Sequence, residues 1–342
     1  MAGERRPEAP LALSMGEPAG VGPELALALW SARSARRTPP FVAVGDPGVF
    51  ASRAALLGID LPLAETEPER APALFPDRFP IYPVGAPCRA EPGRASVEDA
   101  ASVIAAIRES VELVHGGRCS ALVTLPIAKA PLVASGFPHP GHTEYLGALA
   151  ESLWGAPSRA VMLLWSEALA VVPVTVHIPL AEVPVRLTED AIVETARIVA
   201  ADLRGRFGVQ APRLAVAGLN PHAGENGVLG HEDEAIVAPA VRRLQAEGID
   251  AQGPLPADTM FHASARARYD VALAMYHDQA LIPVKTLAFD TAVNATLGLP
   301  FVRTSPDHGT AFDIAGSGTG DPESLLAALR LAQRLTGGPA SA

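Results

Sequence analysis

Short apolar runs alternate with longer helix-like segments along almost the whole chain, and this alternation constrains the fold more than any other feature. Gly, Pro or polar residues bound most of the runs, as is typical of buried strands. Strands that alternate with helices predict an α/β fold with a largely parallel sheet and right-handed crossovers. The expected strands are Leu11–Met15, Phe41–Gly45, Ile81–Val84, Ala121–Leu125, Ala160–Trp165, Leu169–Val176, Leu214–Gly218, Val271–Tyr276 and Leu287–Phe289. The expected helices are Pro23–Trp30, Ser96–His115, Glu144–Leu153, Glu189–Arg204, Glu232–Glu247 and Pro322–Leu335.

Length and charge narrow the class of protein further. A chain of 342 residues predicts two domains, although no linker stands out between them. The net charge of −10 argues against a nucleic-acid-binding protein, because such proteins neutralise phosphates with Lys and Arg. A basic pocket for a small phosphorylated substrate stays compatible with that charge.

The same composition predicts a soluble, cytoplasmic protein. Cys88 and Cys119 are too few for a disulfide framework or a cysteine zinc site. The apolar run Leu11–Met15 is too short for a signal peptide. Prolines, a histidine and a glutamate interrupt the apolar stretch Ala168–Val185, so we expect no membrane span and no membrane partner.

Three histidines follow expected strands: His177, His222 and His277. Strand ends in neighbouring βα units converge at one edge of a sheet, where α/β proteins bind ligands. Three protein ligands with an open position form the usual layout of a catalytic metal site. Any one of these residues alone is more simply a hydrogen-bonded structural histidine. Their shared position in the fold favours the metal.

A second group of polar residues is suited to an anion. His142 and Thr143 precede an expected helix, whose first N–H groups favour a phosphate or carboxylate. Thr143 could instead serve only as the helix N-cap. Lys285, Asn294 and Arg303 lie among apolar segments, where a buried charge without an anionic partner is costly.

Two glycine-rich loops, Gly16–Gly22 and Gly316–Gly320, are most simply turns. Neither matches G-x-G-x-x-G, so no Rossmann dinucleotide site is predicted. Asp258 and Asp307 are candidates for a supporting or cofactor role without further evidence from the pattern.

Seven stretches, spread from near residue 14 to near residue 320, closely resemble the 4-hydroxythreonine-4-phosphate dehydrogenase family. They are rich in Gly, Pro and His, and they occur in the family's order. The chain departs from the usual family pattern at Ala280, where glycine is common. The seven stretches are Met15–Glu24, Gly141–Leu146, Gly218–Glu225, Pro256–Met260, Met275–Gln279, Thr296–Ser305 and Asp307–Thr310.

The resemblance implies an isocitrate/isopropylmalate dehydrogenase-like fold, with two α/β/α domains, a cleft between them and a homodimer. We place the first domain at 1–140 together with 290–342, and the second at 141–289. The second domain would carry most metal ligands and the dimer interface, with the active site near that interface. The residues that match the family's metal ligands are His177, His222 and His277, drawn from both subunits. Those that match its substrate-binding positions are His142, Thr143, Lys285, Asn294 and Arg303.

The implied reaction is the oxidation and decarboxylation of 4-phosphohydroxy-L-threonine in pyridoxal phosphate biosynthesis. It needs NAD or NADP and one divalent metal, for which Zn²⁺, Co²⁺ and Mg²⁺ are all candidates. Lys285 is the predicted catalytic residue, for proton transfer or charge stabilisation. Three alternatives stay open: a D-threonate or D-erythronate 4-phosphate dehydrogenase, a metal-dependent hydrolase, and a non-catalytic phospho-ligand-binding protein.

Overall fold

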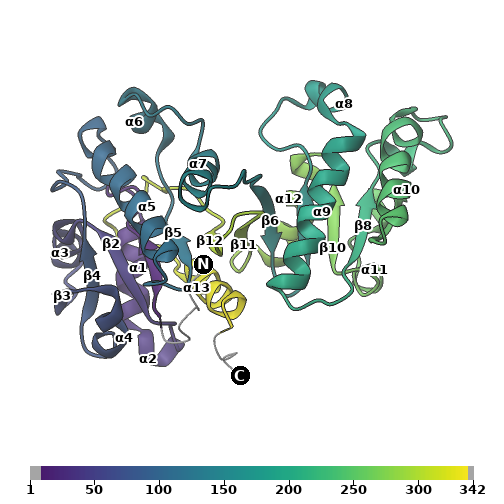
Figure 1. The fold of residues 1–342 in the computed structure, drawn as a ribbon. Helices are drawn as coiled ribbons and strands as arrows, with labels where there is room; N and C mark the ends of the chain where they lie inside the picture. Colours follow the sequence, from purple (N-terminus) through teal and green to yellow (C-terminus); the bar gives the residue numbers. More distant parts are fainter. Residues whose placement is uncertain (1–8, 338–342) are drawn as a thin grey trace. The chain divides into compact units, whose positions relative to one another are not determined.

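A computed structural model describes residues 9–337, which divide into two compact units (Figure 1). Unit 1 contains the described residues up to Ala160 and those from Leu299 on. Unit 2 is Val161–Gly298. Each unit has its own strands, helices and buried core.

Unit 1 is built on a parallel sheet with the strand order β3-β4-β2-β1-β5-β12. Its central strands are buried along their whole length, as expected where helices cover both faces of a parallel sheet. The strands are β1 (Leu11–Ser14), β2 (Phe41–Gly45), β3 (Leu63–Glu65), β4 (Phe79–Pro83), β5 (Leu122–Thr124) and β12 (Arg303–Pro306). The helices are α1 (Gly22–Ser31), α2 (Arg33–Arg36), α3 (Pro47–Leu56), α4 (Ala71–Leu74), α5 (Ala100–His115), α6 (Lys129–Ala134), α7 (His142–Trp154) and α13 (Glu323–Leu335).

Unit 2 has a mixed sheet with the strand order β11-β6-β7-β10-β8-β9. Strands β7, β10, β8 and β9 are parallel, whereas β6 pairs antiparallel with β7 and with β11. The strands are β6 (Val161–Trp165), β7 (Ala170–Pro173), β8 (Arg213–Ala217), β9 (Asp250–Leu255), β10 (Val271–Ala274) and β11 (Val293–Leu297). The helices are α8 (Val183–Arg186), α9 (Glu189–Gly205), α10 (Ala238–Ala246), α11 (Ala263–Arg266) and α12 (His277–Ala288).

The core of unit 2 explains how α12 is held against the strands that precede the histidines. Ala280 and Val284 on α12 are fully buried and pack with Val171 of β7 and Ala272 of β10. Ala280 stands where glycine is common in the family, and its methyl group lies in this core. The apolar side of α12 therefore fixes the helix whose first residue is His277.

The predicted α/β fold is confirmed, but one predicted element is wrong. Leu287–Phe289 is the end of α12 and not a strand, because the helix continues through Pro283. Four strands were not predicted: β3, β9, β11 and β12. They are short or contain Pro, Gly and charged residues, and the sheet around them supplies the pairing that their own sequences do not indicate.

The unit boundaries fall after Ala160 and after Gly298, whereas the sequence placed them at 140 and 289. Helix α7 packs on α5 and so belongs to unit 1. Strand β11 pairs with β6 and so belongs to unit 2. No helix within residues 9–337 is long and apolar enough to cross a membrane.

Candidate active site

The three histidines of unit 2 lie beyond the carboxyl ends of three neighbouring parallel strands. His177 follows β7, His277 follows β10 and His222 follows β8, and the strands lie in the order β7-β10-β8. We call His177, His222 and His277, together with the residues that connect each of them to its strand, the histidine edge. The rings of His177 and His277 lie 5.6 Å apart, centroid to centroid. The predicted convergence is therefore present for this pair.

His277 is the first residue of α12 and has a carboxylate beside one ring nitrogen. Its Nδ1 lies 2.7 Å from Oδ1 of Asp278. The His277 side chain is 33% exposed, so the ring can be reached from solvent. In metal sites, a carboxylate commonly holds one ring nitrogen of a histidine, so that the other nitrogen, here Nε2, can bind the metal.

His222 lies in a loop with an unusual backbone. His222 and Ala223 have φ values of +52° and +54°, and Glu225 and Asn226 have values of +44° and +55°. Non-glycine residues in this region each cost about 1–3 kcal/mol, so the surrounding structure has to hold them there. Asp233, which is fully buried, accepts hydrogen bonds from the backbone N–H groups of Leu219 (2.7 Å) and Asn220 (3.0 Å).

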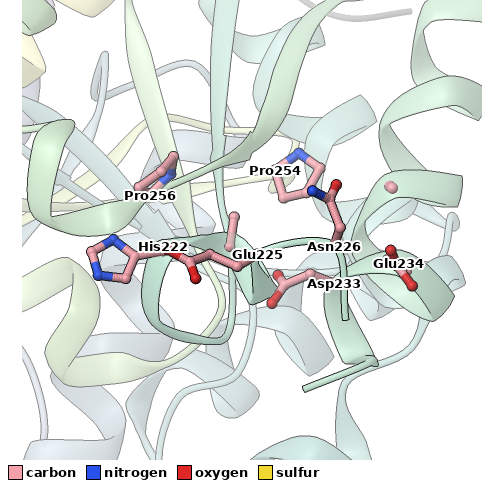
Figure 2. Close-up of a pocket in the computed structure, with 9 residues that line it drawn as sticks. His222, Glu225, Asn226, Asp233, Glu234, Pro254 and Pro256 are labelled. Carbon is pink, nitrogen blue, oxygen red and sulfur yellow. The ribbon is translucent and has the colours of Figure 1, made fainter. Parts of the chain in front are cut away.

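The His222 loop borders an open pocket of about 410 Å³ (Figure 2). His222 lies at one end of the view and Glu234 at the other, with Asp233 between them. Carboxylates and an amide line the pocket together with two prolines. The lining residues are His222, Ala223, Glu225, Asn226, Asp233, Glu234, Ala238, Pro254 and Pro256.

The structure does not bring all three histidines together within one chain. Among residues 9–337, no group of three or more His, Cys, Asp or Glu side chains is arranged to hold a metal ion. His177 and His277 are neighbours, and His222 lies on the separate loop described above.

Two other predicted residues of unit 2 flank this edge in sequence. Lys285 lies on α12, partly buried, with its Nζ 5.4 Å from the centroid of the Phe289 ring. Asn294 is the second residue of β11 and stands opposite Leu164 of β6.

Unit 1 holds a buried cation at the start of β12. The Arg303 side chain is buried, and its Nε and Nη2 donate to Oγ1 of Thr124 at 3.2 and 2.7 Å. Burial lowers the pKa of Arg303 to about 10, because the charged form loses its hydration. Ser14, fully buried at the end of β1, has an Oγ with no hydrogen-bond partner among the described residues.

His142 lies close enough to Arg303 to respond to its charge. Burial, and secondarily the charge of Arg303, holds the pKa of His142 well below its usual range. Its Nε2 is buried and has no hydrogen-bond partner within residues 9–337. We call His142, Thr143, Thr124 and Arg303 the arginine cluster.

Helix α7 begins two residues earlier than predicted. His142 is its first residue and Thr143 its second, so Thr143 is not the N-cap. The N-cap is Gly141, which has an extended backbone and no capping side chain. The first N–H groups of α7 therefore have no acceptor within the helix and no capping side chain. Helix N-termini of this kind bind anions.

Some supporting residues could not be recognised from the sequence. These residues form hydrogen bonds to segments distant in sequence: Asp233, Thr124 and Gln279. Of the three, only Gln279 stood in a recognisable sequence motif, Met275–Gln279.

The two glycine-rich loops share a buried anchor. The Glu24 carboxylate accepts hydrogen bonds from the N–H groups of Gly316 and Gly318. Arg53 donates to Glu24 and to the Gly20 carbonyl. These hydrogen bonds hold both loops in place.

Comparison with known proteins identifies the family. The family model described as pyridoxal phosphate biosynthetic protein PdxA matches residues 37–332. The chain belongs to the PdxA family. A relative from Methylorubrum populi named 4-hydroxythreonine-4-phosphate dehydrogenase is 58% identical over 334 residues, covering 97% of this chain and 96% of the relative. The predicted family and the dehydrogenase class are thereby confirmed.

Solved PdxA-like structures support the same assignment. The 4-hydroxythreonine-4-phosphate dehydrogenase from Klebsiella pneumoniae is 36% identical, with a TM-score of 0.83 and coverage of 96% of this chain and 99% of that one. A terephthalate 1,2-cis-dihydrodiol dehydrogenase from Burkholderia xenovorans is 28% identical, with a TM-score of 0.63 and coverage of 95% and 98%. The PdxA-like fold therefore also occurs in a dehydrogenase named for another substrate.

Proposed function

We propose that this PdxA-family chain catalyses the NAD(P)-linked oxidation and decarboxylation of 4-phosphohydroxy-L-threonine to 3-amino-2-oxopropyl phosphate. The step would serve pyridoxal 5'-phosphate biosynthesis. One observation carries the proposal: His177, His277 and His222 follow the ends of three adjacent parallel strands of a PdxA-family chain. The name of the 58% identical relative supports the substrate.

The histidine edge would hold one divalent metal. Neutral imidazoles suit Zn²⁺ and Co²⁺, and Mg²⁺ is the third candidate from the sequence. The neighbouring rings of His177 and His277 fit two ligand positions, and the partner subunit would help to complete the site. When bound, the metal would lower the pKa of the substrate hydroxyl and stabilise the negative charge that develops during decarboxylation.

The arginine cluster would bind the phosphate. Arg303 would provide a buried positive charge that Thr124 orients, and the first N–H groups of α7 would provide further donors. His142 is neutral at physiological pH because its pKa is lowered, so it would donate or accept a hydrogen bond rather than contribute charge. Binding energy from the phosphate would position the reacting carbon.

Lys285 would move the proton in the oxidation step. It would accept the hydroxyl proton as the hydride leaves the same carbon for NAD(P)⁺. The bond between the carboxylate and the carbon next to the new carbonyl then breaks, and CO₂ leaves. The electron pair of that bond stays on this carbon, which is then protonated. Asn294 would hydrogen-bond a polar group of the substrate. The dinucleotide accepts the hydride, and the protein aligns it with the substrate.

Exposed apolar side chains support a homodimer formed through unit 2. Among residues 9–337, ten large apolar side chains are exposed, and seven of them are in unit 2. All seven follow one of the three histidines within twelve residues, so a partner that covers them would also cover the histidine edge. They are Leu180, Val185, Val228, Leu229, Ile282, Leu287 and Phe289. A cytoplasmic location stays a prediction.

The closest alternative keeps the reaction and changes the substrate. The Burkholderia xenovorans neighbour is named for a non-phosphorylated substrate, so the fold alone does not select one. D-threonate or D-erythronate 4-phosphate lacks the amino group, and kinetics on both classes of substrate would separate the two readings. The arginine cluster would suit the phosphate group of either class of substrate.

The proposal is tested by NADH or NADPH formation with 4-phosphohydroxy-L-threonine, with and without a chelator. We expect activity that the chelator abolishes and that Zn²⁺, Co²⁺ or Mg²⁺ restores. His222→Ala should lose bound metal and product formation together. Retention of both would remove His222 from the mechanism, and hydrolysis without cofactor reduction would favour a hydrolase.

A further inference from the structure

The amide of Gln279 joins two segments of the histidine edge. Gln279 lies in the first turn of α12, two residues after His277. Its Oε1 accepts a hydrogen bond from Met275 N–H at 2.6 Å, and its Nε2 donates to the Gly218 carbonyl at 2.7 Å. Met275 directly follows β10, and Gly218 directly follows β8. One side chain therefore spans the ends of two neighbouring parallel strands.

Other hydrogen bonds extend this connection to the remaining strand ends. Thr175, two residues before His177, donates its hydroxyl to the Met275 carbonyl at 2.7 Å. The N–H and the carbonyl of Met275 are thus held from two sides, by Gln279 and by Thr175. Beyond Gly218, Asp233 fixes the next two N–H groups, which lead into the His222 loop.

We propose that Gln279 is a positioning residue that fixes the positions of the His222 and His277 segments and thereby sets the affinity for the divalent metal. The inference rests on the metal centre of the proposed function. It adds a residue that does not touch the metal and acts through the backbone on two ligands at once.

The chemistry of a glutamine suits this position. A neutral amide offers one acceptor and one donor, and here the two are used on opposite sides. A glutamate carboxylate would face the Gly218 carbonyl with a second acceptor, and an apolar side chain would satisfy neither group. Both backbone partners lie next to buried strand ends, where an unsatisfied polar group is costly.

The strain of the His222 loop makes it sensitive to such a change. The loop keeps four non-glycine residues at positive φ, which requires support from its ends. Loss of the Gly218 anchor would let the loop relax and move His222. Residues that orient metal ligands typically change metal affinity by about 10–100-fold when they are removed.

The experiment compares two Gln279 variants with a matched control in the same unit. Gln279→Met removes both hydrogen bonds at nearly the same length, and Gln279→Asn keeps an amide that is one methylene shorter. Gln245→Met is the control, since Gln245 also donates from Nε2 to a backbone carbonyl, that of Ala251, at 2.8 Å. Metal-free proteins are titrated with Co²⁺ in a chelator buffer, and the Kd, the visible absorption bands and the metal-free Tm are measured.

We expect Gln279→Met to raise the Kd for Co²⁺ by about 10–100-fold and to alter its absorption bands. Gln279→Asn should give an intermediate Kd, and it decides the question if the methionine variant does not fold. Gln245→Met should bind Co²⁺ as the unsubstituted protein does. Unchanged Kd and bands in the folded Gln279 variants, or an equal loss of affinity in Gln245→Met, would overturn the inference.

His222→Ala, titrated in parallel, separates this inference from the proposed function. If that variant binds Co²⁺ as tightly as the unsubstituted protein, the metal centre itself is wrong and the role of Gln279 is refuted with it. If His222→Ala loses Co²⁺ while the Gln279 variants keep it, the centre stands and only the positioning role is refuted.

Discussion

The arginine cluster in unit 1 and the histidine edge in unit 2 place functional groups in opposite environments. Arg303 is 6% exposed and is oriented by Thr124, and His142 is kept neutral by burial. The His277 side chain is 33% exposed, and the His222 loop is exposed and strained. Large apolar side chains are exposed within twelve residues after each of the three histidines along the chain.

This difference indicates two ways of preparing a site. Unit 1 removes a cation from water in advance and orients it through Thr124, which is the arrangement of a preorganised electrostatic site. Under the proposed function, unit 2 would present its metal ligands on segments that one chain leaves uncovered, so metal binding and subunit association would depend on one another. Unit 1 would then select its ligand by charge, and unit 2 would depend on assembly.

The largest effect is expected from removal of the buried cation. Arg303→Met should lower kcat/KM for the phosphorylated substrate by about 10²–10³-fold, since truncating one partner of a buried charge pair costs about 2–5 kcal/mol. Steady-state kinetics measures this loss, and metal content should not change. Arg213→Met, at an exposed ion pair, is the control. A loss below threefold would show that unit 1 does not select by charge.

Removal of the proposed proton carrier should have the next largest effect. Lys285→Ala should lower kcat by roughly 10²-fold or more, the usual contribution of general acid–base catalysis. The bound metal should remain, because no predicted ligand changes. Turnover and metal content, measured on the same sample, test both statements. Unchanged turnover would show that the assignment of Lys285 is wrong.

A charge on the exposed apolar surface of unit 2 should weaken the proposed homodimer. Ile282, which is 65% exposed on α12, is the site for Ile282→Glu. Burial of this carboxylate in an interface should raise the dimer Kd at least about tenfold. Light scattering over a concentration series measures it. Leu56→Glu in unit 1, at a side chain that is 58% exposed, is the control. Equal behaviour of the two variants would contradict an interface in unit 2.

The smallest effect concerns pH and tests the desolvation of unit 1. The pKa of His142 is lowered in the folded state, so below about pH 6.5 the unfolded chain binds a proton that the folded chain does not. His142 should therefore destabilise the fold as the pH falls, by up to about 1.4 kcal/mol per pH unit. Urea unfolding at pH 7 and pH 5 should show a smaller loss of stability for His142→Asn. The exposed His231→Asn is the control, and equal slopes for all three proteins would refute the prediction.

Much of the fold was predictable from local pattern. The strands β2 and β10 begin at the predicted residues, because continuous apolar runs bounded by polar residues have few other uses in a chain of this kind. Helix α12 was not predicted, because Pro283 interrupts its pattern and its stability comes from packing against the sheet. Strand β12 was missed for a similar reason, since Arg-Thr-Ser-Pro becomes a strand only beside β5.

The sequence by itself determined the family and the α/β class and supplied the candidate site residues, because these follow from residue types at fixed positions along the chain. The tertiary structure decided which of those side chains are desolvated and which are connected. Burial of Arg303, the neighbouring rings of His177 and His277, and the bridge made by Gln279 all join residues that are distant in sequence. Such contacts depend on how strands are ordered in a sheet, and no local pattern of residues encodes that order.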